Sequence, residues 1–158
     1  MRTLPIALLA LGLVLTGCQY LTPPPEVDIL TVDPISRQVN QSSGGTTFDA
    51  SITLKTTNNV SALLRQIQVQ YYDADGEHTV ASNAPALPME VELGLGSTGP
   101  IEVTISAIPV VVSAEMITWM YANGSNAVAK IVCTGVDAYD RELEWDADIN
   151  IGIYAIDL

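Results

Sequence analysis

The chain has 158 residues, and its 18 acidic side chains outnumber the 6 basic ones to give a formal net charge of −12 at pH 7. A charge this negative repels nucleic-acid phosphates and anionic lipid headgroups, so neither is an expected partner. The single histidine excludes a histidine-rich metal site, and the length is that of one ordinary domain.

The N-terminal segment has the organisation of an export signal. Arg2 precedes a short apolar run, Leu4 to Leu15, which is typical of a secretory signal peptide and too short to cross a bilayer as a helix. The run closes with Leu15-Thr16-Gly17-Cys18, a tetrapeptide that resembles the lipobox of bacterial lipoproteins. The alternative is an ordinary signal peptide, which favours an A-x-A-like ending that Leu-Thr-Gly does not provide.

This resemblance implies a membrane anchor. It implies that residues 1–17 are removed as a signal peptide and that Cys18 becomes the N-terminus, with diacylglycerol on its thiol and a further acyl chain such as palmitate on its amine. Two or three acyl chains hold a domain on a membrane far more firmly than one. In this family an aspartate after the cysteine signals inner-membrane retention in enteric bacteria. Gln19 stands there instead, so the expected location is the outer membrane of a Gram-negative bacterium.

Residues 18–26 form the expected tether between the lipid and the domain. They include Pro23-Pro24-Pro25, which favours a polyproline II shape. At about 3.1 Å per residue, the eight residues after the cysteine span about 25 Å. The alternative is an ordered leader that packs on the domain.

From Val27 onward, apolar and polar residues alternate in the manner of half-buried strands. Ser113 is a suitable N-cap for one short helix near 113–122, which Asn123-Gly124 ends. The alternation predicts strands over 27–33, 48–55, 66–71, 78–81, 89–93, 101–106, 127–136 and 142–151.

Seven or eight short antiparallel strands with turns between them predict a mainly β fold, an antiparallel β-sandwich over residues 27–158. The layout resembles immunoglobulin-like or fibronectin-III-like modules. It departs from true immunoglobulin domains because Cys133 has no second cysteine to pair with if Cys18 carries lipid, and because Trp119 and Trp145 come late in the chain. The stretch from Phe48 to Tyr72 also resembles the β-sandwich of water-stress (late embryogenesis abundant) proteins.

One strand carries an unusual row of carboxylates. Consecutive acidic residues in this row stand about 6.7 Å apart on one face, because each residue of a strand rises about 3.3 Å. The row could bind divalent cations or a basic partner, helped by two acidic residues of the preceding turn. The alternative is a solvated face that protects a sheet edge. The candidate strip consists of Asp137, Asp140, Glu142, Glu144, Asp146 and Asp148.

Other candidate sites are weaker. Asp73-Ala74-Asp75-Gly76 has the start of a calcium loop, but Ala84 stands where an EF-hand needs its glutamate, so a hairpin turn is expected. His78 lies near no nucleophile motif, and Cys133 alternates with apolar residues as a packed thiol would. No catalytic residue and no confident metal site are therefore expected.

These patterns predict a non-enzymatic envelope lipoprotein without a cofactor, held at the membrane through Cys18, whose β-sandwich binds or scaffolds envelope proteins. One alternative is a surface domain that binds calcium or carbohydrate. For carbohydrate, the candidate residues are Tyr71, Tyr72, Tyr139 and Trp145. A second alternative is an accessory subunit of a multiprotein envelope complex.

Overall fold

The computed structural model describes residues 22–96, 99–146 and 150–156. Within these residues the protein is mainly β with one α-helix, as the sequence predicts. The elements in chain order are β1 (Val27–Asp33), β2 (Ser36–Asn40), the 3₁₀ helix η1 (Gln41–Ser43), β3 (Gly45–Thr56), β4 (Ala62–Asp73), β5 (Leu87–Leu93), β6 (Leu95–Gly96), β7 (Gly99–Pro100), β8 (Glu102–Ser113), α2 (Ala114–Asn123), β9 (Ala127–Asp137), β10 (Glu142–Asp146) and β11 (Ile151–Ile156).

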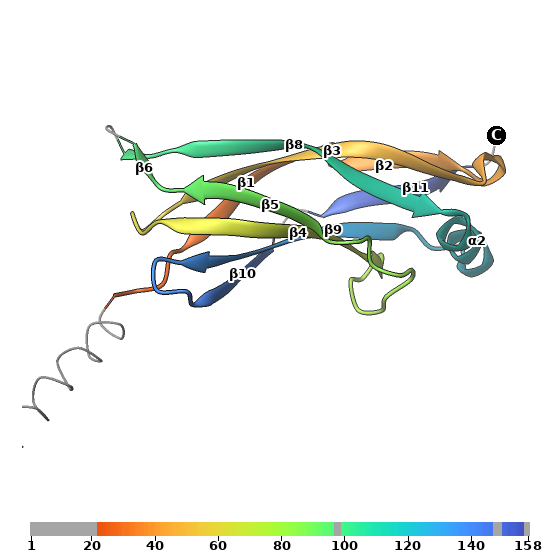
Figure 1. The fold of residues 1–158 in the computed structure, drawn as a ribbon. Helices are drawn as coiled ribbons and strands as arrows, with labels where there is room; N and C mark the ends of the chain where they lie inside the picture. The colour runs from red at the N-terminus through yellow and green to blue at the C-terminus, as the bar shows by residue number, and fades with distance from the viewer. Residues whose placement is uncertain (1–21, 97–98, 147–149, 157–158) are drawn as a thin grey trace, which may run out of the picture.

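The long strands form two sheets (Figure 1). The strand order is β1-β3-β8 in the first sheet and β2-β11-β9-β4-β5 in the second, where β10 also pairs with β9. Neighbouring strands are antiparallel except for β2 and β11, which run parallel. β4 pairs with one edge of β9. The other edge of β9 is shared by β10, which lies opposite residues 132–136, and β11, which lies opposite residues 127–129.

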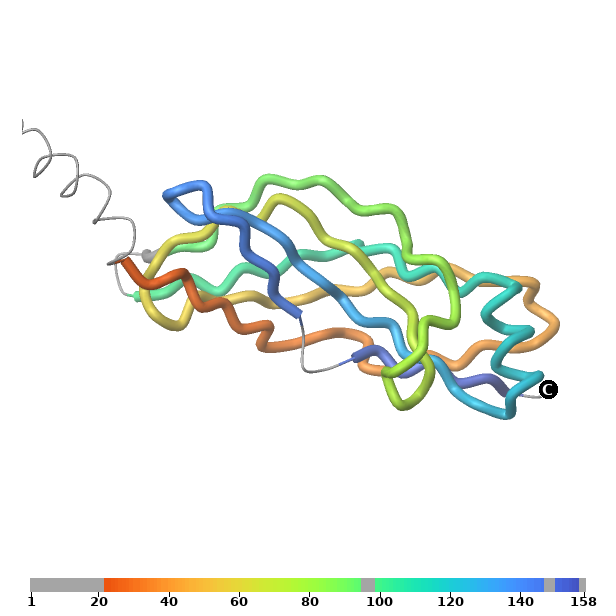
Figure 2. Tube along the Cα trace, turned by 90° about the horizontal axis from the view of Figure 1, so that it is seen from below, coloured from red at the N-terminus to blue at the C-terminus, as the bar shows by residue number. Residues whose placement is uncertain are grey.

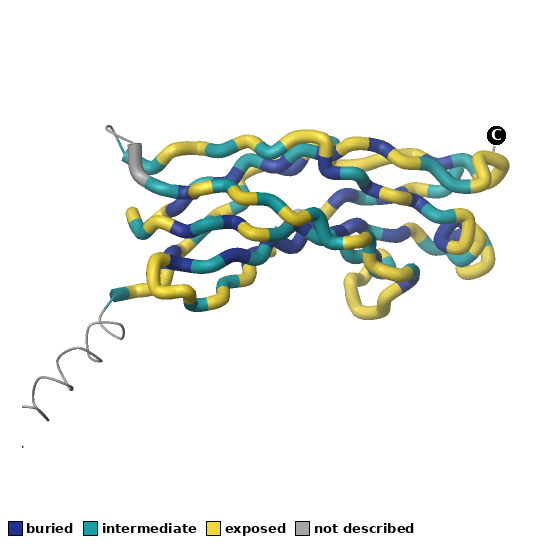
Figure 3. Tube along the Cα trace, in the orientation of Figure 1, coloured by how far each residue is buried: buried dark blue, intermediate teal, exposed yellow. Residues whose placement is uncertain are grey.

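Alternating side chains from both sheets make one core. In β3, Phe48, Ala50, Ile52 and Leu54 are all buried, while the residues between them are exposed or half-buried. Burying a large side chain such as Phe48, Ile52 or Leu54 contributes about 1.5–3 kcal/mol relative to leaving it in water. Figure 3 shows the same alternation of buried and exposed positions along the strands.

The helix begins and ends where the sequence predicts to within one residue. The Ser113 side chain accepts a hydrogen bond from the Met116 backbone N–H at 3.1 Å. Gly124 adopts a left-handed conformation (φ 58°) that lets its N–H reach the last carbonyls of the helix. Met116, Ile117 and Met120 are buried in the core, so α2 is held mainly by its apolar face.

Several strands differ from the sequence-based expectation. The predicted strand at 142–151 is two strands, because continuing the register of β10 would place Ile151 opposite Ala127, whereas it lies opposite Ala129. Residues 78–81 form only one isolated bridge, Tyr72 with Thr79. The sequence analysis also did not predict β2, the short strands β6 and β7, or residues 107–112 of β8.

The described part of the protein is elongated along its strands (Figures 1 and 2). The 12-residue strands β3, β4 and β8 each span about 40 Å at about 3.3 Å per residue. One end carries the start of β1, the β3–β4 turn and the β9–β10 turn, and the other carries η1, α2 and the end of β11 (Figure 1). The segment before β1 therefore joins the domain at the end opposite α2.

Candidate functional site

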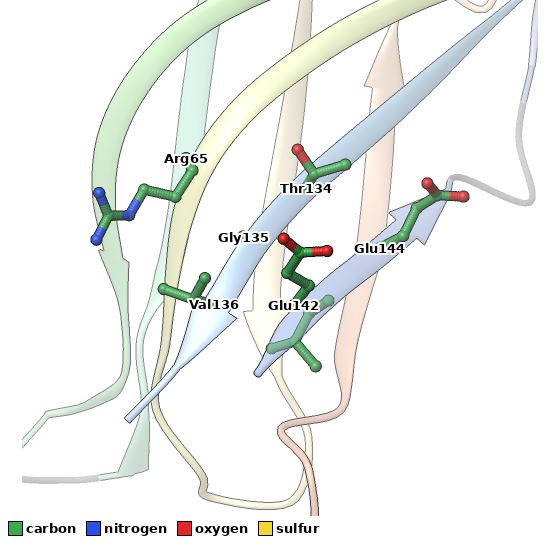
Figure 4. A pocket seen from close by; sticks show the side chains of 7 residues that line it. Arg65, Thr134, Gly135, Val136, Glu142 and Glu144 are labelled. Atoms are coloured by element: carbon green, nitrogen blue, oxygen red, sulfur yellow. The ribbon is translucent and has the colours of Figure 1, made fainter. Parts of the chain in front are cut away.

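A shallow groove crosses the outer face of the second sheet where β4, β9 and β10 lie side by side. Its volume is about 420 Å³, and a second hollow of about 410 Å³ adjoins it through Arg65 and Val136. Figure 4 shows Arg65 on one side of the groove, Glu142 and Glu144 on the other, and Thr134 between them. The groove thus combines a mainly apolar lining with charges of opposite sign on its two walls.

The predicted acidic strip is only partly brought together. Glu142, Glu144 and Asp146 are all exposed at alternate positions of β10, as predicted for one strand face. Asp146 forms an ion pair with Lys130 of β9. The hydrogen bond with Asp146 raises the pKa of Lys130 and outweighs burial, which alone would lower it. The negative charge of Glu144 adds to the increase. One end of the strip is therefore already neutralised.

Asp137 does not belong to an exposed strip, because its side chain is only 1% exposed. Its carboxylate accepts hydrogen bonds from the backbone N–H groups of Tyr139 (2.8 Å) and Arg141 (3.0 Å), and from the Arg141 side-chain Nε at 2.5 Å. Burial alone would raise the pKa of Asp137, but these bonds and the Arg141 charge outweigh it and lower the pKa. Asp137 is the structural acceptor of the turn.

The remaining residues of the strip do not complete a cation site. Asp140 sits at the tip of the β9–β10 turn with a left-handed backbone (φ 58°), and Asp148 lies outside the described residues. Across the described ranges, no group of three or more His, Cys, Asp or Glu side chains is placed to hold a metal ion.

The Asp73 turn is arranged as a hairpin. Asp73 Oδ1 accepts hydrogen bonds from the backbone N–H groups of Glu77 (2.8 Å) and His78 (3.2 Å), and Oδ2 lies 3.0 Å from His78 Nδ1. Burial opposes these bonds, yet the pKa of Asp73 is lowered overall. The carboxylate therefore closes its own turn, which is the hairpin arrangement expected from the sequence.

The aromatic candidates for carbohydrate binding do not form one surface. Tyr71 and Trp145 are buried, at 2% and 8% exposure, while Tyr139 is 39% exposed in the β9–β10 turn. The Tyr71 hydroxyl accepts a hydrogen bond from Val111 N–H at 2.8 Å, which satisfies one donor of β8, and burial raises the pKa of this phenol. Cys133 is fully buried, and burial raises the pKa of its thiol to about 12.

The described part of the tether begins at Thr22, four residues after Cys18, which lies outside the described residues. Both guanidinium nitrogens Nη1 and Nη2 of Arg141 lie 3.3 Å from the Thr22 carbonyl oxygen. The Tyr139 hydroxyl lies 3.1 Å from Thr22 Oγ1. Residues 22–26 thus contact the domain, the arrangement of the ordered-leader alternative.

Sequence analysis missed the two arginines that organise this region, Arg65 and Arg141. The signal available for Arg141 was its spacing from Asp137, since an acidic and a basic residue four positions apart can meet across a tight turn. No comparable signal marks Arg65, which becomes part of the groove only through sheet pairing. No helix in the described residues is long and apolar enough to span a membrane.

Comparisons with known proteins found few similarities. No family model and no curated protein matches the chain. Among solved structures, it is similar to a solution structure described as that of a candidate late embryogenesis abundant (LEA) protein. The match has a TM-score of 0.49 and 15% sequence identity, and it covers 90% of this chain and 76% of the other.

Proposed function

We propose that this protein is a lipid-anchored protein of the bacterial cell envelope, most consistent with the outer membrane of a Gram-negative species. The observation that carries the proposal is the tetrapeptide Leu15-Thr16-Gly17-Cys18 after a short apolar run. In this proposal residues 1–17 are removed, and acyl chains on Cys18 bind the leaflet. The segment after Cys18 leads directly into the domain.

The domain's proposed task is non-enzymatic binding or scaffolding of other envelope components. The groove of Arg65, Glu142 and Glu144 supports a partner that carries both charged and apolar groups, because the groove exposes charges of both signs beside a mainly apolar lining. The buried, high-pKa thiol of Cys133 does not suit a nucleophile, which must be an accessible thiolate. We therefore assign to the domain a role in binding other molecules and not in catalysing a reaction.

We also infer an immunoglobulin-like arrangement of the two sheets. Immunoglobulin domains place strands A, B and E in one sheet and G, F and C in the other, with C′ added beside C in variable domains. If β1, β3 and β8 correspond to A, B and E, the first sheet has that order. If β11, β9, β4 and β5 correspond to G, F, C and C′, the second sheet also has the immunoglobulin order. The helix α2 would then lie on the E–F connection.

Expression in a Gram-negative host followed by intact-mass analysis tests the anchor. The expected mature protein begins at Cys18 and carries the mass of a diacylglycerol plus an acyl chain. It sediments with membranes after a high-salt wash, which removes proteins held only by charge. A mature N-terminus without fatty mass overturns the proposal.

Two cysteine variants sharpen this experiment. Cys18→Ala should lose all fatty mass and leave the washed membrane fraction. Cys133→Ala, the matched control, should keep both the lipid and the membrane association, because Cys133 is buried in the core. Fatty mass that follows Cys133 instead of Cys18 contradicts the assignment.

A further inference from the structure

The leader, defined as residues 22–26, is held at two places on one end of the domain (Figures 1 and 2). One is the β9–β10 turn, where Arg141 and Tyr139 contact Thr22. The other is Asn58 in the β3–β4 turn. These contacts join positions separated by 32 to 119 residues in the chain, so they depend on the finished fold.

The Arg141 guanidinium is fixed before it meets the leader. Its Nε donates to the buried carboxylate of Asp137 at 2.5 Å, and its Cζ lies 5.5 Å from the centre of the Tyr139 ring. With Nε held, the two terminal nitrogens both face the Thr22 carbonyl. A fixed fork of donors binds an acceptor at a smaller entropic cost than a free side chain does.

Asn58 uses both ends of its amide on the leader. Its Nδ2 donates to the Pro24 carbonyl at 2.7 Å, and its Oδ1 accepts from the Glu26 backbone N–H at 3.1 Å. The Thr57 backbone N–H donates to the Glu26 carbonyl at 2.8 Å. Pro25, which lies between Pro24 and Glu26 in the chain, is buried. The proline run is therefore bound by its backbone and packed by its ring.

We propose that Arg141, Tyr139 and Asn58 form a clasp that shortens the membrane tether and fixes which end of the domain faces the lipid leaflet. This inference rests on the proposed lipidation of Cys18. With the clasp closed, the chain from the lipid to the first clasped residue runs only from Cys18 to Thr22, and four residues span at most about 14 Å at about 3.6 Å per residue. With the clasp open, the corresponding chain runs from Cys18 to Val27, and nine residues reach at most about 32 Å at about 3.6 Å per residue.

The closed clasp gives the domain a polarity relative to the membrane. The β3–β4 and β9–β10 turns lie next to the leaflet, and α2 lies at the far end of strands about 40 Å long. Partners in the envelope space therefore meet the α2 end first. The groove, on the side of the sheet near the clasp, stands close to the membrane surface.

The test places a fluorophore at either end of the lipidated full chain in vesicles that contain lipids with a nitroxide quencher on the headgroup. Ser61→Cys carries the probe at the clasp end and Ala122→Cys at the α2 end, both at exposed positions. Labelling is specific, because Cys133 is buried and the proposed lipid occupies the Cys18 thiol. We expect at least threefold stronger quenching at Ser61→Cys than at Ala122→Cys.

Opening the clasp should weaken this difference. Arg141→Ala, and independently Asn58→Ala, are expected to lower quenching at the Ser61 probe at least twofold. Lys55→Ala is the matched control, because it removes a half-buried cation from β3 that pairs with Glu102 and not with the leader. Equal quenching at both ends of the parent chain overturns the proposal. The proposal also fails if quenching of the Ser61 probe in both clasp variants equals that in Lys55→Ala.

A lipid-independent readout separates this inference from the proposed function. In detergent micelles, amide exchange at Glu26 should rise at least threefold in Arg141→Ala and stay unchanged in Lys55→Ala. Circular dichroism identifies any variant that fails to fold. If Arg141→Ala is unfolded, the test rests on Asn58→Ala, which leaves the Asp137–Arg141 pair intact. Fatty mass with unchanged exchange in Asn58→Ala refutes the clasp alone, whereas absent fatty mass refutes the anchor.

Discussion

Gly135 should be the least replaceable glycine of the second sheet. It lies near the C-terminal end of β9, opposite Leu64 of β4 and Leu143 of β10. A Cβ built there would stand 2.4 Å from the Leu63 carbonyl oxygen and 2.9 Å from Cη2 of Trp145. The first neighbour is backbone in a paired strand and the second is a buried ring, so neither can move aside without disturbing the sheet.

The expected cost of Gly135→Ala is about 3 kcal/mol, at the upper end of the range for adding a methyl group to a filled core. That is a large share of the 5–15 kcal/mol by which domains are stable. It corresponds to a melting temperature about 10 °C lower for a domain of this size. Urea unfolding followed by tryptophan fluorescence measures the loss, with an unchanged dependence on urea concentration.

Gly94→Ala is the control for Gly135→Ala. A Cβ at Gly94 would lie 3.2 Å from Ser61 Oγ, the end of a small side chain that can rotate, so we expect a loss below about 1 kcal/mol. Equal losses for the two variants, or a Gly135→Ala loss under about 1 kcal/mol, would refute the close packing of β4, β9 and Trp145.

Two further predictions concern titratable groups. The pKa of Asp137 is lowered on folding, so its stabilising contribution is fully present above the ordinary pKa of 3.8 and is lost as the pH falls through the lower pKa of the folded state. The deficit of Asp137→Asn in urea melts, about 1–2 kcal/mol at pH 7, should therefore shrink as the pH is lowered below 3.8, and a constant deficit would count against the role of the charge. Because burial raises the thiol pKa of Cys133 to about 12, a thiol reagent at pH 8 should modify the native protein at least 100-fold more slowly than the urea-unfolded chain, and comparable rates would contradict its burial.

Local patterns were sufficient for the elements whose own sequence determines their packing. Phe48 to Leu54 alternate strictly, so burial of one face of β3 follows from the sequence alone. The caps at Ser113 and Gly124 define α2 because both act within one turn of the helix. In these cases the partner atoms lie within a few residues, or the partner is simply the apolar core.

Elements that depend on distant segments could not be found in this way. β2 buries only Val39, so it carries no alternation, and it is a strand because β11 pairs with it in parallel. The alternation from Glu142 to Ile151 continues without a break, yet pairing to β9 shifts between β10 and β11. A shift of two residues preserves which face each side chain occupies, so periodicity alone cannot show it.

Dependence on the finished fold also explains why some residues of the acidic strip form ion pairs and others do not. Asp137 and Asp146 each acquire a cationic partner, Arg141 and Lys130, that only the folded turn and the β9–β10 pairing supply. Glu142 and Glu144 remain, exposed and without an ion pair among the described residues.

These two carboxylates favour a basic group over a calcium ion. Their Cα atoms are about 6.7 Å apart along the strand, and calcium needs six to eight oxygens within about 2.6 Å of one point. Glu142 and Glu144 could contribute at most four oxygens from an open strand face. A lysine or arginine needs only one of them, and it would lie on the groove wall opposite Arg65. The β10 wall of the groove is therefore negative and its β4 wall positive, an arrangement that favours binding a single cation-bearing side chain over chelating a metal ion.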